Sequence, residues 1–209
     1  MRRSRRLPLT ELAPYLLEAP ESPAVLDLAA VFGNDRPVEV EVGFGKGLFL
    51  LTTAMAHPEV NFAGIEIERK YFLYTATRIA KRKLANVKLA HGDARDFLGQ
   101  RMPAASLYAV HVYFPDPWWK KRHHKRRVFT AEFAADCCRV LRPGGQLHVA
   151  TDVEEYFGLI RQAVAPLASL TPVPVGEAPR PAESFRTNFE RKALERGGTV
   201  YQARYERLP

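Results

Sequence analysis

The stretch Glu41-Val42-Gly43-Phe44-Gly45-Lys46-Gly47 lies at the end of a short valine-rich segment that starts at Val38, and it precedes a segment of helix length. Glycine allows a positive φ and a close approach of the backbone to a ligand, so this pattern indicates a strand that turns into a helix beside a nucleoside. The dinucleotide fingerprint G-x-G-x-x-G needs its third glycine one residue later. The spacing therefore favours a nucleoside ligand other than NAD. A tight turn that binds no ligand stays open as an alternative.

Short apolar runs alternate with helix-length segments from Val38 onward, which predicts an α/β fold. We expect a doubly wound, mostly parallel sheet of about seven strands whose last strand is antiparallel, in a single domain over residues 24–209. Residues 1–23 are expected to form a flexible, arginine-rich arm. The predicted strands lie near 38–42, 61–65, 87–90, 107–112, 146–150, 168–173 and 199–206, and the predicted helices near 48–56, 69–84, 130–140 and 153–164. Residues 141–145 are expected to form a turn before strand 146–150.

The composition suits one ordinary globular domain, with 209 residues, 46% of them hydrophobic and 26% charged. No apolar run approaches the roughly 20 residues of a membrane span. We therefore expect a cytoplasmic protein without a membrane partner. The two cysteines, Cys137 and Cys138, are adjacent, so we expect them in the core without a disulfide. No metal site is expected, because the chain lacks a set of ligands at suitable spacing.

The net charge of +8 is concentrated in two segments. Residues 120–127 (KKRHHKRR) contain six lysines and arginines and no acid, and the first six residues contain four arginines. The remainder of the chain is nearly neutral. A concentrated cationic patch favours phosphate binding, because each neutralised phosphate releases counterions. A solvated charged segment is the alternative that composition alone leaves open.

Four acidic residues follow or end four successive predicted strands, namely Glu41, Glu66, Asp93 and Asp116. The carboxyl ends of neighbouring parallel strands line one crevice, so we expect these carboxylates to converge there. An acid at the position of Glu66 can bind ribose hydroxyls. A crevice this acidic suits a cationic sulfonium better than a pyrophosphate.

The segment Phe114-Pro115-Asp116-Pro117-Trp118 follows the fourth predicted strand. Two prolines stiffen this loop and fix Asp116 between them, while the aromatic residues offer faces for stacking of a base. A fixed polar group and a stacking surface are what positioning of a base for a reaction requires. A rigid buried turn with Trp118 in the core is the other interpretation.

The chain resembles the tRNA (guanine-N7)-methyltransferase family in five blocks. They are E-V-G-F-G-K-G at 41–47, F-P-D-P-W at 114–118, K-x-R-H-x-K-R-R at 120–127, A-T-D at 150–152 and T-N-F-E at 187–190. The resemblance implies a Rossmann-like class I methyltransferase with S-adenosylmethionine as cofactor and tRNA as partner. It further implies methylation of N7 of a variable-region guanine, at position 46 in standard tRNA numbering. A monomer and a homodimer remain equally open.

The same resemblance implies roles for individual residues. Asp116 is the implied catalytic residue. The implied cofactor-binding residues are Glu41, Gly43, Gly45, Gly47, Glu66, Asp93 and Asp116; the implied substrate contacts are Lys120, Asp152, Thr187, Asn188, Phe189 and Glu190; the implied RNA contacts are Arg122, His123, His124, Lys125, Arg126 and Arg127. Residues 187–190 also have the spacing of a helix capping box, which is a purely structural alternative.

Three other functions remain as alternatives to be tested. An amino-group methyltransferase on RNA or DNA would use a similar loop, although residues 115–117 lack the consecutive prolines of that motif. A non-catalytic RNA-binding module could retain the cofactor pocket. A nicotinamide oxidoreductase is disfavoured by the glycine spacing.

Overall fold

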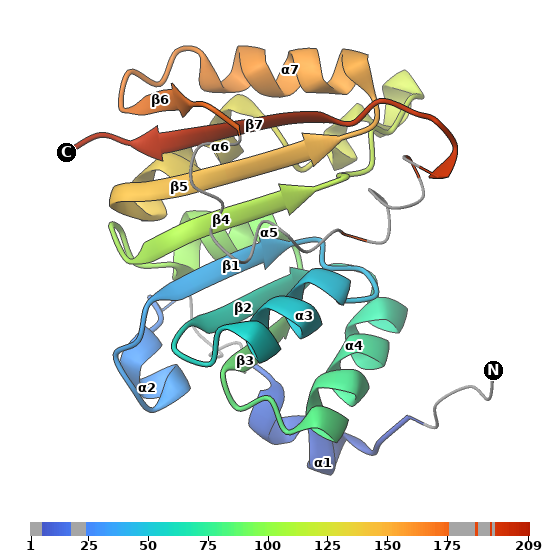
Figure 1. Cartoon of the computed structure of the whole chain (residues 1–209), viewed down its shortest axis with the longest axis vertical. Helices are drawn as coiled ribbons and strands as arrows, with labels where there is room; N and C mark the ends of the chain where they lie inside the picture. Colours follow the sequence, from blue (N-terminus) through green and yellow to red (C-terminus); the bar gives the residue numbers. More distant parts are fainter. Residues whose placement is uncertain (1–5, 18–23, 176–186, 188–192, 194) are drawn as a thin grey trace.

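A seven-stranded sheet forms the centre of the molecule, in the order β3-β2-β1-β4-β5-β7-β6 (Figure 1). The computed structural model describes residues 6–17, 24–175, 187, 193 and 195–209. The strands are β1 (Val38–Val42), β2 (Asn61–Glu66), β3 (Val87–His91), β4 (Leu107–Tyr113), β5 (Leu141–Thr151), β6 (Leu170–Val173) and β7 (Tyr201–Arg207). The first five strands are parallel, and β7 runs antiparallel to both β5 and β6. The predicted doubly wound, mostly parallel sheet with an antiparallel last strand is confirmed.

Helices cover both faces of this sheet (Figure 1). They are α1 (Leu9–Leu12), α2 (Leu28–Phe32), α3 (Leu48–Ala56), α4 (Arg69–Arg82), α5 (Ala94–Asp96), α6 (Ala131–Val140) and α7 (Glu154–Val164), with the short helical turns η1 (Ala13–Tyr15), η2 (Phe97–Arg101) and η3 (Lys121–Arg126). The four long helices agree with the predicted segments to within two residues at each end. Within the described ranges, no helix has the length and apolar character needed to span a membrane.

Two hydrophobic clusters hold these layers together. In one cluster α3 and α4 pack against β2 and β3, through side chains such as Phe49, Ile79 and Phe62. In the other, α6 and α7 pack against the opposite face, and Cys137 of α6 is fully buried there. Both cysteines are free thiols on α6; Cys137 lies in the core as predicted, whereas Cys138 is only half-buried against it. The central strand β1 is buried along its whole length, although its sequence alternates valines with Glu39 and Glu41.

The N-terminal segment differs from its prediction. Residues 9–15 form α1 and η1, Leu12 is only 1% exposed, and the N–H of Leu17 donates to the carbonyl of Leu89 in β3. The prediction of a flexible arm is therefore wrong for this stretch. Its leucines cover the edge of the sheet beside β3, and the sequence prediction gave too much weight to the arginines that precede them. Residues 1–5 and 18–23 lie outside the described part of the chain.

Strand β5 also starts earlier than expected. Leu141 already pairs with Leu107, and Gln146 pairs with Ala109, so the register shifts between these two pairs. Gly144 has a φ of +74° within the extra residues. The segment predicted as a turn is therefore an irregularity inside the strand.

Candidate active site at the carboxyl ends of the strands

The glycine loop joins β1 to α3 and has positive φ at all three glycines, with 71° at Gly43, 51° at Gly45 and 63° at Gly47. A Cβ atom at Gly47 would lie 2.2 Å from Cγ2 of Thr75 in α4. The hydroxyl of Thr75 also donates to the carbonyl of Gly45 over 3.0 Å. Position 47 requires glycine, because the positive φ disfavours any other residue and Thr75 occupies the space of a Cβ atom.

Glu66, at the end of β2, holds the glycine loop through a hydrogen bond to its backbone. Its Oε2 accepts the N–H of Gly45 and its Oε1 accepts the N–H of Glu68, both over 2.8 Å. Burial raises the pKa of this carboxyl, and the backbone N–H groups oppose that shift. Each carboxylate oxygen has a second lone pair, so Glu66 can still accept a bond from a ligand hydroxyl.

Glu41, on β1, is a buried carboxyl that lacks a full set of partners. Its side chain is 5% exposed, and no described atom makes a hydrogen bond to Oε2. Burial and the neighbouring charge of Glu66 raise the pKa of Glu41 to about 8. A buried acceptor without a partner is costly, so this atom is suited to a donor or cation supplied by a ligand.

Asp93 follows β3 and is held by an arginine that sequence analysis did not single out. The guanidinium of Arg95 binds both carboxylate oxygens of Asp93 and holds the pKa of that carboxyl below its usual range. Nη1 of the same guanidinium donates to the carbonyl of Lys125 over 3.0 Å. Arg95 therefore connects Asp93, after β3, to the basic segment. The position of Arg95 two residues after Asp93 was the only signal for it in the sequence.

The loop after β4 is strained on both sides of Asp116. Phe114 has a φ of 51° and Trp118 a φ of 45°, values that bulky residues rarely adopt. The N–H of Phe114 donates to the carbonyl of Ala150 over 2.7 Å, which ties the loop to β5. Asp116 itself is exposed. Strain of this kind costs about 1–3 kcal/mol and accumulates at functional sites.

The basic segment forms η3 and supports the same loop. The guanidinium of Arg126 lies 5.0 Å from the centroid of the Trp118 ring, and Nε of Arg127 donates to the carbonyl of Pro117 over 2.7 Å. The ring of His123 meets Trp118 edge to face at 5.7 Å. Trp118 is therefore half-buried under the basic segment, whereas Trp119 is 61% exposed. The segment thus places a concentration of positive charge against the loop that carries Asp116.

The remaining predicted residues are placed only in part. Asp152, after β5, and Lys120, before η3, are both exposed at this edge of the sheet. Thr187 is buried, and it has a contact within the structure. Asn188, Phe189 and Glu190 lie outside the described residues, so the capping box stays a prediction.

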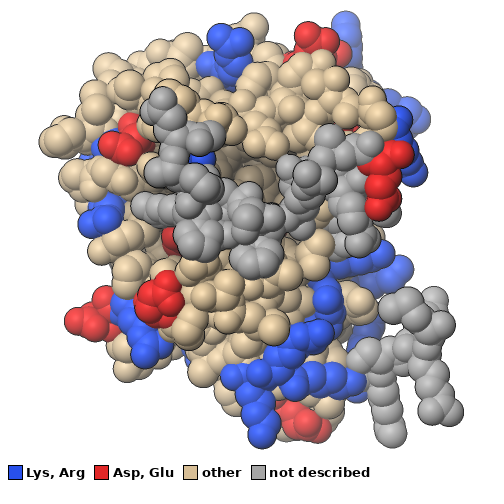
Figure 2. All heavy atoms as spheres, in the orientation of Figure 1, with Lys and Arg blue, Asp and Glu red and all other residues tan. Residues whose placement is uncertain are grey.

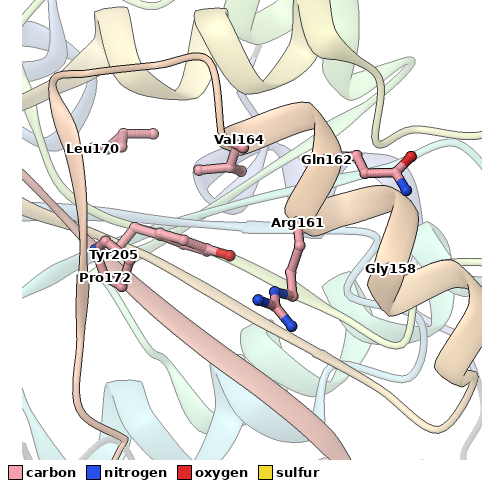
Figure 3. Close-up of a pocket in the computed structure, with 8 residues that line it drawn as sticks. Gly158, Arg161, Gln162, Val164, Leu170, Pro172 and Tyr205 are labelled. Atoms are coloured by element: carbon pink, nitrogen blue, oxygen red, sulfur yellow. The ribbon is translucent and has the colours of Figure 1, made fainter.

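A cavity of about 490 Å³ lies elsewhere, between α7, β6 and β7 (Figure 3). Val164, Leu170 and Pro172 line it, and the side chains of Arg161 and Tyr205 extend into the same space. This cavity is at the β6 end of the sheet, several strands from the glycine loop. It is separate from the strand ends that carry the four predicted carboxylates.

Comparison with known proteins shows the family of the chain. The family described as "Putative methyltransferase" matches residues 35–203. The tRNA (guanine-N(7)-)-methyltransferase of Rhodopirellula baltica is 44% identical over 96% of this chain and 77% of its own length. The chain belongs to the tRNA (guanine-N7)-methyltransferase family. A second member, from Nitrosospira multiformis, is 38% identical over 87% of this chain and 80% of its own length.

Solved structures agree with this methyltransferase fold. The 16S rRNA methyltransferase KamB matches with a TM-score of 0.62 at 18% identity, over 88% of this chain and 95% of its own. The aminoglycoside resistance methyltransferase NpmB1 matches with a TM-score of 0.58 at 20% identity, over 87% and 92% of the two chains. These structures show the class I methyltransferase fold, and membership of the tRNA (guanine-N7)-methyltransferase family gives S-adenosylmethionine as the cofactor.

The glycine loop and the carboxylates fit this cofactor. The unpartnered Oε2 of Glu41 suits a cationic ligand, and the free lone pairs of Glu66 suit hydroxyl donors. Besides Arg95, the sequence analysis missed Thr75, which closes the loop from α4. A single sequence does not show whether a threonine on a helix is exposed or, like Thr75, buried against another segment.

Proposed function

We propose that this methyltransferase modifies N7 of the variable-region guanine at position 46 of tRNA. The observation that carries the proposal is the Asp116 loop, strained at both ends and bound to a cationic segment through Arg126 and Arg127. Family membership supports a guanine in tRNA as the acceptor. The proposal adds the position of that guanine and a role for each residue.

In this proposal S-adenosylmethionine is held by the residues of the glycine loop and the carboxylates after the strands, namely Glu41, Gly43, Gly45, Gly47, Glu66, Asp93 and Asp116. When bound, the cofactor supplies an electrophilic methyl group on a cationic sulfur. The buried carboxylates offset positive charge, and the open backbone at Gly43 and Gly45 lets the ligand approach closely, since a Cβ there would meet nothing within 4 Å.

N7 of guanine carries a free lone pair, so no residue has to remove a proton. The task of the chain is then alignment of the base. We assign to Asp116 the orientation of a polar edge of the guanine or of the cofactor. Its charge also offsets the positive charge that the base acquires on methylation.

The proposed contacts with the base are made by Lys120, Asp152 and residues 187–190. The proposed contacts with the RNA backbone are made by residues 122–127. Glu190 accepts from the N1–H and exocyclic amine of guanine in this assignment, which separates guanine from adenine. The exposed side chains of Arg122 and Lys125 are available to phosphates.

A pair of tRNA transcripts tests the proposed position. One transcript carries guanine at position 46 and the other carries adenine there, and both are incubated with labelled S-adenosylmethionine. We expect label only in the first transcript. Equal labelling of both transcripts would place the reaction at another nucleotide.

A further inference from the structure

One side of α4 carries cations that the site above does not use. The helix contains Arg69, Lys70, Arg78, Lys81 and Arg82, and no Asp or Glu. Lys and Arg side chains gather over α4 in Figure 2. Outside the two basic segments the chain is nearly neutral in sum, but its acids lie on elements other than α4. The surface of α4 is therefore a third basic surface.

The helical spacing gathers part of this set into one stripe. Phe72, Thr75 and Ile79 are buried. On the opposite side, Tyr71, Tyr74, Arg78 and Arg82 follow one another at three- or four-residue spacing, with Lys70 and Lys81 beside them. We call the six residues Lys70, Tyr71, Tyr74, Arg78, Lys81 and Arg82 the α4 stripe.

Aromatic rings lie between the cations of the α4 stripe. Tyr71 is 37% exposed and Tyr74 is 39% exposed. The guanidinium of Arg78 lies 5.6 Å from the centroid of the Tyr74 ring. Cations that bind phosphates and rings on which bases stack form the common chemistry of nucleic-acid surfaces.

The α4 stripe is continuous with the active site. Nη1 of Arg78 donates to the carbonyl of Lys46 over 2.6 Å, and Lys46 is an exposed residue of the glycine loop. The helix itself begins three residues after Glu66. In Figure 1, α4 and the yellow-green turn of η3 lie at the same side of the sheet, toward which the arrowheads of β1 and β4 point.

We propose that the α4 stripe is a second tRNA-contact surface, which binds the sugar–phosphate backbone away from the methylated guanine. This inference rests on the proposed function, since it takes the same tRNA as its ligand. A folded tRNA presents phosphates over a surface much larger than one nucleotide, and contacts at both η3 and α4 would fix its orientation over the strand ends. The rings of Tyr71 and Tyr74 would pack against exposed bases or riboses.

Two double variants of equal charge test the α4 stripe. Lys70→Gln/Lys81→Gln removes two exposed cations from α4. Arg36→Gln/Arg161→Gln removes two exposed cations from other faces of the molecule, and serves as the matched control. The dissociation constant for bulk tRNA is measured by fluorescence anisotropy over a series of KCl concentrations, after equal unfolding midpoints have been verified for both doubles.

We expect the α4 double to weaken tRNA binding about tenfold near physiological salt and to lower the slope of log K against log salt by about 1.5, as loss of two phosphate contacts requires. KM for tRNA should rise while kcat at saturating tRNA and S-adenosylmethionine affinity stay close to those of the control. Equal tRNA affinity in the two doubles would overturn the inference, as would weaker binding with an unaltered salt slope. If the parent chain neither binds nor methylates tRNA, the proposed function fails instead.

Discussion

The backbone N–H of Gly45 donates to Oε2 of Glu66 over 2.8 Å, so the end of β2 holds the loop that follows β1. The other oxygen of the same carboxylate accepts the N–H of Glu68 before α4. One carboxylate thus fixes the glycine loop and the start of α4. The backbone of the proposed cofactor site is therefore held in place by hydrogen bonds within the chain.

Glu66→Gln tests this role. Glutamine has one acceptor oxygen, so one of the two N–H groups loses its partner, which costs about 1–3 kcal/mol when the group is buried. We expect the free energy of unfolding in urea to fall by that amount and S-adenosylmethionine affinity, measured by calorimetry, to fall with it. The exposed Glu68→Gln is the control. Equal stability of the two variants would contradict the assignment.

Gly47→Ala tests the contact between the glycine loop and α4. The new Cβ would meet Thr75 at 2.2 Å, at a φ of 63°. We expect a loss of about 2–5 kcal/mol in the free energy of unfolding, since overpacking adds to backbone strain. Gly144→Ala has a similar φ and open space around it, so it should lose only about 1–2 kcal/mol. A smaller loss for Gly47→Ala than for Gly144→Ala would show that the contact with Thr75 is unimportant.

Glu41 predicts a pH dependence of stability. Its pKa is about 8 in the folded chain and near 4.5 when exposed, so the folded state retains a proton that the unfolded state releases. This contribution to stability is complete below about pH 4.5 and is lost as the pH rises to about 8. Glu41→Gln should remove it. Urea unfolding from pH 5 to 8 should show the parent losing stability relative to the variant, and parallel curves would contradict the raised pKa.

The same carboxyl predicts proton release on cofactor binding. A cation beside Glu41 favours its charged form, so S-adenosylmethionine should displace a proton near pH 7. Calorimetry in two buffers with different ionisation enthalpies measures the number of protons released. We expect a release by the parent that Glu41→Gln lacks. An equal release by both chains would assign the proton to another group.

Asp116→Ala should lower turnover far more than cofactor affinity. Loss of one positioned electrostatic group at a reacting centre typically costs on the order of a hundredfold in rate. Single-turnover methylation of tRNA measures the rate, and calorimetry measures the affinity for S-adenosylmethionine. Glu132→Ala, an exposed acid on α6, is the control. A rate for Asp116→Ala equal to that of the control would remove Asp116 from the reaction.

The sequence was informative where a residue type has one structural meaning. The three glycines of the loop require positive φ, and all three have it. Alternating apolar runs and helical segments predicted the sheet and its long helices. The convergence of Glu41 and Glu66 followed from the rule that neighbouring parallel strands end at one edge, and their electrostatic interaction agrees with it.

The sequence was less informative where a role depends on contacts between distant segments. Arg95 reaches both Asp93 and Lys125, and Thr75 closes the glycine loop from α4. Net charge summed along the chain could not show that the cations of α4 share one face. The leucines of residues 7–17 carried no signal of their place against β3, because a short apolar segment predicts burial without its partner.

Identification of the methylated nucleoside tests the central claim most directly. The parent chain is incubated with labelled S-adenosylmethionine and bulk tRNA, and the tRNA is digested to nucleosides for chromatography. The account predicts label in 7-methylguanosine, mapped to position 46 of the tRNA. Label in a nucleoside methylated on its exocyclic amine, or no label in tRNA at all, would contradict it.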